Sequence, residues 1–105
     1  MAALDRGRTR DGGYKKRAEK FGVRYTAFPR EWVFERDGWI CGLCDKPVDR
    51  HLAYPAPMSA SLDHVIPLSR GGHHEPENVQ CSHLTCNVRK GARVDARSTP
   101  QAVGA

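Results

Sequence analysis

The sequence predicts a small α+β domain that is held together by a structural zinc ion and carries a basic N-terminal extension. Three observations support this fold class. The chain has only 105 residues, with 10 glycines and 7 prolines, so it buries a small core and needs an additional crosslink. Two pairs of metal-binding residues, Cys41–Cys44 and His83–Cys86, flank its central region. Around them, helical and β-compatible segments follow in the order helix, metal-binding turn, β-hairpin and helix.

Two helices are expected before the first pair of cysteines. A short basic helix within residues 14–25 ends at Gly22, because glycine accepts the backbone angles of a helix C-terminus. Pro29 opens the second helix, since its missing N–H group would have no partner in a first turn. This helix covers residues 30–37 and ends at Gly38.

The remaining elements surround the hairpin. Residues 39–44 are a tight turn, and the following stretch to residue 60, with three prolines, is an irregular loop. The pattern then predicts a strand over 61–68, a turn over 69–72, a short returning strand over 78–81 and a last helix over 83–90. Ser82 is expected to cap this helix and Gly91 to end it.

The predicted organisation is a basic, partly disordered arm over residues 1–28, one domain over 29–93 and a flexible tail over 94–105. Formal charge divides the chain similarly, with +6 in residues 1–30, −4 in 31–86 and +3 in 87–105. Basic flanks around an acidic centre are typical of a protein that binds the DNA backbone beside a cation. A solvated basic tail without a partner would give the same pattern.

The location of the protein is expected to be the cytoplasm. No run of about 18 apolar residues is present, so no membrane partner is expected. The first ten residues also lack the apolar core of a secretion signal. Cysteines in this compartment are kept reduced.

The cysteine spacing predicts a zinc site. The first pair is spaced C-x2-C and the second H-x2-C, with 38 residues between them, which suits a tetrahedral ion bound by Cys41, Cys44, His83 and Cys86. A disulfide is the alternative, and a reducing compartment disfavours it. Cys81 could replace His83 on count alone, but residues three apart at a helix start share one face. Cys81 is therefore expected to be a small buried residue.

Three motifs follow one another in the C-terminal half: Leu62-Asp-His-Val-Ile-Pro-Leu-Ser-Arg-Gly-Gly72, Glu77-Asn-Val-Gln80 and Cys86-Asn-Val-Arg-Lys-Gly91. With the two metal-binding turns, they resemble the HNH nuclease family over residues from about 30 to 93. The resemblance implies the ββα-metal fold, also called the His-Me finger. Asn87 stands where many members have the final histidine, so the chain resembles the HNN variant.

The resemblance implies a DNA endonuclease that uses one divalent cation. His64 would be the general base, since a histidine is largely neutral at pH 7. Asp63 and Asn87 would bind Mg²⁺ or Mn²⁺ through hard oxygen atoms, and Asn78 would orient the His64 ring. Adjacent residues of an ideal strand face opposite sides. The hairpin must therefore be twisted at residues 63–64, or the phosphate must straddle the strand edge.

Each of these residues also has a non-catalytic explanation. A strand histidine, a turn aspartate and a helix asparagine need no catalytic role outside this context. Arg70, Arg89, Lys90 and Arg93 are expected to contact phosphates, with plain solubilising charges as the alternative. His74 is expected in solvent, with a contact to phosphate or metal as the alternative, and His73 on the surface.

Two functions fit this composition: a metal-dependent endonuclease and a non-catalytic zinc-knuckle module that binds DNA. The set of Asp63, His64, Asn78 and Asn87 favours the enzyme, because a pure binder does not need a base beside a hard-metal site. Short chains of this type resemble those encoded by bacteriophages, which can serve DNA packaging beside the terminase. The oligomeric state is left open, because one active site cuts one strand.

Overall fold

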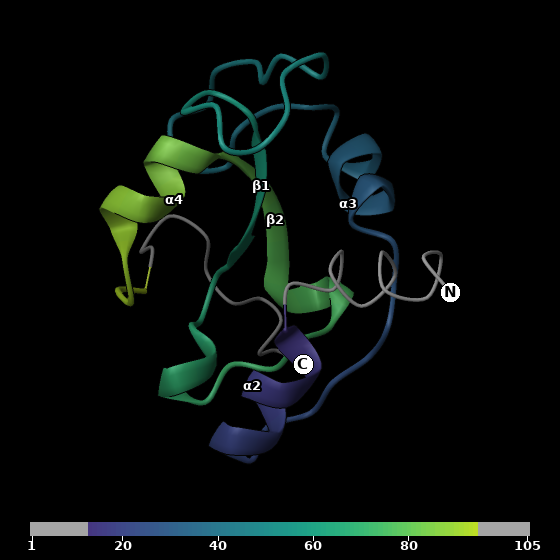
Figure 1. Cartoon of the computed structure of the whole chain (residues 1–105), viewed down its shortest axis with the longest axis vertical. Helices are drawn as coiled ribbons and strands as arrows, with labels where there is room; N and C mark the ends of the chain where they lie inside the picture. The colour runs from purple at the N-terminus through teal and green to yellow at the C-terminus, as the bar shows by residue number, and fades with distance from the viewer. Residues whose placement is uncertain (1–12, 95–105) are drawn as a thin grey trace.

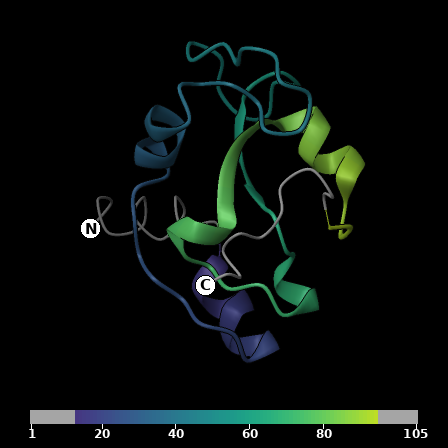
Figure 2. The same ribbon diagram turned by 180° about the vertical axis from the view of Figure 1, so that it is seen from behind.

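A computed structural model describes residues 13–94 and confirms the small α+β class. The elements are helices α2 (Tyr14–Phe21), α3 (Arg30–Arg36) and α4 (Leu84–Lys90), strands β1 (Ala60–His64) and β2 (Val79–His83), and 3₁₀ helices η1 (Leu68–Arg70) and η2 (Pro76–Asn78). Helices α3 and α4 lie on either side of the hairpin, and α2 lies near the end where β1 leaves the sheet (Figure 1; seen from behind in Figure 2). The disorder expected over residues 1–12 and 95–105 lies outside the described residues.

The first two helices begin and end close to the predicted positions. Gly22 ends α2 with φ 66°, and its N–H group is directed at the carbonyl groups of Ala18 and Glu19. Pro29 is extended, with ψ 132°, so it precedes α3 rather than forming its first turn. Two apolar residues of α3 join the core cluster against the sheet, which consists of Val33, Phe34, Cys41, Val48, Leu62, Val79 and Cys81.

The first strand is shorter than predicted. It pairs antiparallel with β2 from Ala60 opposite His83 to His64 opposite Val79. The Val65 N–H group still donates to the backbone carbonyl oxygen of Asn78 at 2.9 Å, but the Ile66 N–H group donates to the side-chain oxygen of Asn78, also at 2.9 Å. Pro67 then offers no N–H group. The predicted strand over 61–68 therefore ends at residue 64, because the Asn78 side chain replaces a backbone partner for Ile66.

The returning strand is longer than predicted and takes the residue expected to cap the last helix. The Ser82 hydroxyl donates to the carbonyl oxygen of Ser61 at 3.1 Å, which places Ser82 inside the hairpin. His83 is the last residue of β2 and also the N-cap of α4. Gly91 ends α4 as predicted.

A second backbone pairing attaches the N-terminal segment to the hairpin loop. The Thr26 N–H group donates to the His74 carbonyl oxygen at 2.8 Å, and the His74 N–H group donates to the Arg24 carbonyl oxygen at 2.9 Å. Tyr25 and His74 thus form a parallel bridge. Residues 24–26, which lie within the predicted N-terminal arm, are therefore attached to the hairpin loop. No helix among residues 13–94 is long and apolar enough to cross a membrane.

Gly72 allows the hairpin loop to close. A methyl group at this position would collide with the carbonyl oxygen of Ile66, which is backbone and cannot rotate away. We therefore expect Gly72→Ala to lower the free energy of unfolding by about 1–3 kcal/mol. Urea unfolding of the zinc-loaded protein measures this loss. Ser69→Ala, exposed in the same turn, is the control and should change stability by less than about 0.5 kcal/mol. Equal midpoints for the two variants would contradict the clash.

Candidate functional site

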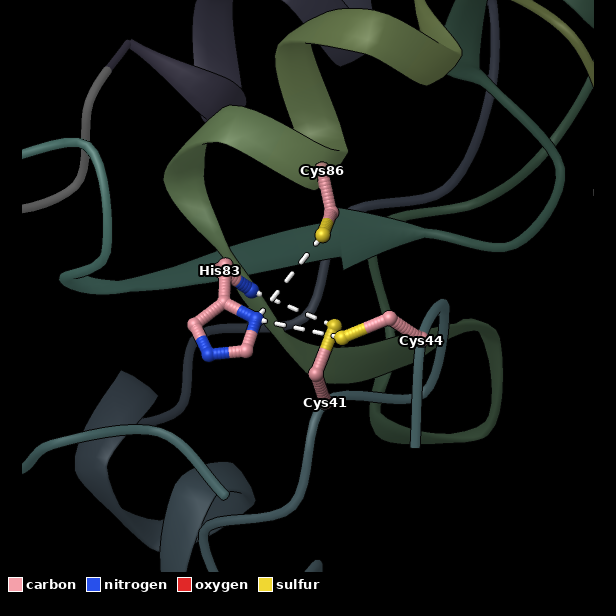
Figure 3. A group of neighbouring side chains, drawn as sticks. All are labelled: Cys41, Cys44, His83 and Cys86. Carbon is pink, nitrogen blue, oxygen red and sulfur yellow. Dashed lines mark hydrogen bonds between the residues drawn. The ribbon is translucent and has the colours of Figure 1, made fainter. Parts of the chain in front are cut away.

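Four predicted metal ligands converge between the turn after α3 and the junction of β2 with α4. Figure 3 shows the side chains of Cys41, Cys44, His83 and Cys86 pointing toward one another. Their ligand atoms all lie within 4.8 Å of one another, and the group could hold a zinc ion. Cys81 lies outside this group. It is fully buried in the core, and burial raises the pKa of its thiol to about 12.

The geometry of this group fits tetrahedral zinc. Zn–S and Zn–N bond lengths imply ligand-to-ligand distances of about 3.5–3.8 Å. The His83 Nδ1 atom lies 3.4 Å from Cys44 Sγ and 3.7 Å from Cys86 Sγ. The other ring nitrogen, Nε2, lies 2.9 Å from the carbonyl oxygen of Pro47, so it carries the proton and leaves Nδ1 free to bind the ion.

The surroundings of the metal-binding group shift the pKa values of Cys86 and Cys44 in opposite directions. Burial, followed by the neighbouring Cys41, raises the pKa of the Cys86 thiol to about 12. Burial acts in the same direction at Cys44, but hydrogen bonds from the backbone of Lys46 and from the other thiols outweigh it and lower the Cys44 pKa. In addition, the N–H groups of Leu43 and His83 both donate to Cys41 Sγ at 3.4 Å. This polar shell suits thiolates that share a divalent ion.

A pocket of about 380 Å³ lies between α2, the end of β1 and α4. Asp63, His64 and Asn87 all line it. Asp63 and His64 are neighbours in one strand, yet both reach the pocket because the hairpin ends here. Tyr14 and Arg17 of α2 form part of the opposite wall.

His64 is held neutral by its surroundings. Burial, followed by His74 and the positive charges of Arg17 and Lys90, lowers the pKa of His64 from 6.5 to about 3. The His64 Nε2 atom lies 3.0 Å from His74 Nδ1. The Tyr14 ring lies 5.1 Å from the His64 ring. At neutral pH the His64 ring is therefore uncharged.

Asp63 is almost fully buried and bonded on both oxygen atoms. The Lys90 ammonium lies 2.9 Å from Oδ1, and the Gln80 amide donates to Oδ2 at 2.8 Å. Lys90 also donates to the carbonyl oxygen of His64 at 2.6 Å. Lys90 was predicted to contact phosphates, but it is only 6% exposed and its charge compensates that of Asp63. A lysine at the end of α4 reaches inward here because Asp63 would otherwise be a buried, unpaired charge.

Two asparagines fix the backbone around the pocket. The Asn87 amide nitrogen donates to the Ser61 hydroxyl at 2.8 Å and to the Leu62 carbonyl at 3.1 Å, which leaves its carbonyl oxygen for other partners. Asn78 is buried and bonds to both backbone groups of Ile66 and to the carbonyl oxygen of His73. Asn78 was expected to orient the His64 ring. Its hydrogen bonds instead connect the backbone of Ile66 to the backbone of His73, at the two sides of the hairpin loop.

His74 lies in the interior rather than in solvent. It is 2% exposed and stacks with the rings of Tyr14, Tyr25 and Phe28. The burial follows from the bridge to Tyr25, which closes the loop over it. In the sequence, the pair His73–His74 and the aromatic residues at 14, 25 and 28 are far apart, and no local pattern relates them. His73 is half-buried and accepts a hydrogen bond from the Arg24 N–H group.

Three of the four basic residues predicted to contact phosphates are exposed. Arg70 ends η1, and Arg89 and Arg93 lie in and after α4. The Arg93 guanidinium donates to the carbonyl oxygen atoms of Lys90 and Arg89. Arg17 was not singled out in the sequence, but it lies on the pocket wall above Tyr14.

The zinc ligands can be distinguished by substitution. We expect purified Cys81→Ser to retain one zinc per chain, because Cys81 Sγ lies in the core and outside the ligand group. His83→Ala should lose zinc and unfold, because its ring is the ligand that faces Cys44 and Cys86. Elemental analysis and circular dichroism measure both effects. Loss of zinc from Cys81→Ser together with its retention in His83→Ala would overturn the ligand set.

The neutral state of His64 should make the fold sensitive to acid. Because its pKa is about 3 in the folded protein and near 6.5 when unfolded, the unfolded chain binds the extra proton between these values. Stability should therefore fall as the pH decreases from about 6.5. His64→Gln removes this contribution, so wild type should lose more unfolding free energy than His64→Gln between pH 7 and 5. Urea unfolding with excess zinc tests this, and parallel pH curves would contradict it.

Comparison with known proteins gives one match. The family model described as HNH endonuclease matches residues 41–93, which is half of the chain. The matched segment contains the four zinc-ligand candidates and the pocket residues Asp63, His64 and Asn87, but not α2 or α3. No curated protein and no solved structure matches the chain.

Proposed function

Because the chain belongs to the HNH endonuclease family, we propose that it hydrolyses phosphodiester bonds in DNA with one divalent cation and a water molecule activated by His64. The family implies a nuclease that acts on DNA. The observation that carries the finer mechanism is the pocket of about 380 Å³, which collects His64, Asp63 and Asn87 from two elements of the matched segment.

His64 is proposed as the general base. Its low pKa keeps the ring neutral at pH 7, so a ring nitrogen is available for a proton from water. A pKa near 3 would make a weak base, but the anionic phosphate of a bound substrate raises the pKa of a nearby histidine. Substrate binding thus moves His64 toward the basicity that the reaction needs.

Asp63 and Asn87 are proposed to hold the catalytic cation. Both residues line the pocket and both offer the hard oxygen atoms that Mg²⁺ and Mn²⁺ prefer. Because the Asp63 oxygen atoms also accept bonds from Lys90 and Gln80, a cation would share these oxygen atoms with those two side chains. A bound cation would stabilise the charge on the scissile phosphate and on the leaving 3′ oxygen.

DNA is proposed to lie across the pocket between α2 and α4. Arg17 on one wall and Arg89 and Arg93 near the other would contact phosphates, with Arg70 at the edge of the hairpin loop. Lys90 forms an ion pair with Asp63 and is not proposed to contact DNA. Contacts of this kind give affinity that falls with salt and carries little sequence preference.

A finer biological role follows only from the resemblance to short bacteriophage-encoded chains. We propose DNA packaging beside a terminase in the cytoplasm of an infected host. One pocket cuts one strand, so nicked products would indicate a monomer acting alone, and linear products a dimer or a partner.

A non-catalytic DNA-binding module is the second candidate. The observation in its favour is the ion pair of Asp63 with Lys90, which already neutralises the carboxylate assigned to the cation. A protein that binds DNA with salt-dependent affinity but cuts none with any divalent ion would be this module.

Supercoiled plasmid distinguishes the two candidates. We expect the zinc-loaded protein to nick it with Mg²⁺ or Mn²⁺ and to stop when EDTA removes these weakly held ions. His64→Ala should reduce the rate at least about 100-fold, because a general base contributes 10²–10⁴-fold, while zinc content and DNA affinity stay unchanged. Arg89→Ala serves as the control for binding, since it should weaken affinity without removing the base. Cutting by His64→Ala at the wild-type rate would refute this assignment.

A further inference from the structure

His74 is held in the hairpin loop by both backbone hydrogen bonds and ring contacts. Both its N–H and its carbonyl group bond to the backbone of residues 24–26, at 2.9 and 2.8 Å. Its ring is near-parallel to those of Tyr14, Tyr25 and Phe28, at interplanar angles of 21°, 10° and 12°. These three rings lie outside the segment that matches the family, so the family match assigns them no role.

The fixed imidazole of His74 is directed at His64. The His74 Nδ1 and His64 Nε2 atoms lie 3.0 Å apart, which is hydrogen-bond distance. Such a bond between two imidazole rings contains one proton, carried by one of the two nitrogen atoms. The position of that proton decides which nitrogen of His64 is left unprotonated.

We infer that His74 is a positioning residue that accepts a hydrogen bond from His64 Nε2–H and so leaves His64 Nδ1 as the proton acceptor. This inference rests on the proposed function, because it concerns the same base. His64 then takes a proton from water at Nδ1, and the water oxygen attacks phosphorus with the electron pair that it keeps. The bond from phosphorus to the 3′ oxygen breaks, and the 3′ oxygen leaves with that electron pair and takes a proton from solvent. The Nδ1 lone pair of His74 stabilises the resulting imidazolium through the Nε2–H bond.

Asn78 supports this arrangement indirectly, through the backbone. It binds the carbonyl oxygen of His73, the residue before His74, and both backbone groups of Ile66. It thereby fixes the backbone that carries His74 relative to the backbone that follows His64. Orientation of the base is thus divided between an asparagine that holds the loop and a histidine that contacts the ring.

Two substitutions separate the hydrogen bond from the packing. His74→Phe keeps a ring between the aromatic neighbours but removes the acceptor. His74→Asn loses the ring but places an amide oxygen near the former Nδ1 position. We expect kcat for plasmid nicking to fall about 10- to 100-fold in His74→Phe with KM unchanged, and to recover at least partly in His74→Asn. A purely structural role would instead favour His74→Phe over His74→Asn.

Nitrogen-15 NMR of the full-length, zinc-loaded protein without Mg²⁺ tests the same inference apart from cutting. We expect His64 of the wild type to show one tautomer, protonated at Nε2, and His74→Phe to show a mixture. A His64 protonated at Nδ1 in the wild type would overturn the inference, as would wild-type kcat in His74→Phe. If the wild type cuts no DNA yet shows the Nε2–H tautomer, the hydrogen bond stands and the proposed function fails.

Discussion

Four side chains from two distant segments must meet within 4.8 Å of one another, and the rest of the molecule is arranged around this meeting point. Within residues 13–94, the core cluster beneath it contains seven buried residues, two of them cysteines. Chains of this size seldom supply enough buried apolar surface for a stable fold. A zinc ion in this group would join the turn after α3 to the start of α4. Cys86 would then set the direction of α4, and Asn87, the next residue, would point into the pocket as a consequence.

The pocket itself is organised by charge compensation. Lys90 neutralises Asp63 and also binds the carbonyl oxygen of His64, so one side chain of α4 ties down two consecutive residues of β1. Positive groups around His64 act together with burial to keep its ring uncharged. The result is a neutral base beside a neutralised carboxylate. In the proposed reaction, the opposite charges of an anionic substrate and a divalent cation would then largely cancel each other in the pocket.

The sequence predicted what depends on local spacing. The C-x2-C and H-x2-C pairs identified the four residues that converge, and Gly22 and Gly91 ended their helices as expected. Features that depend on tertiary contacts were not predictable. The end of β1 depends on Asn78, twelve residues away from Ile66, and the burial of Lys90 on a carboxylate 27 residues earlier. The sequence predicted an exposed His74, because its three aromatic partners lie on a different segment and no local pattern indicates them.

The attachment of residues 24–26 to the hairpin loop also links the N-terminal helix to the metal-binding group. Arg24 and His73 are 49 residues apart, so joining them closes a long loop. The metal-binding group lies across this loop, since Cys44 and His83 are 39 residues apart and His83 follows the bridge. Once those ligands are crosslinked, the shortest covalent path between Arg24 and His73 runs through Cys44 and His83 and is roughly three fifths as long. Shortening a loop by this factor lowers the free-energy cost of closing it by about 0.4 kcal/mol. Metal binding at this group would thus favour the docking of the N-terminal helix, so the wall that encloses His64 would gain stability from an ion bound at a different site.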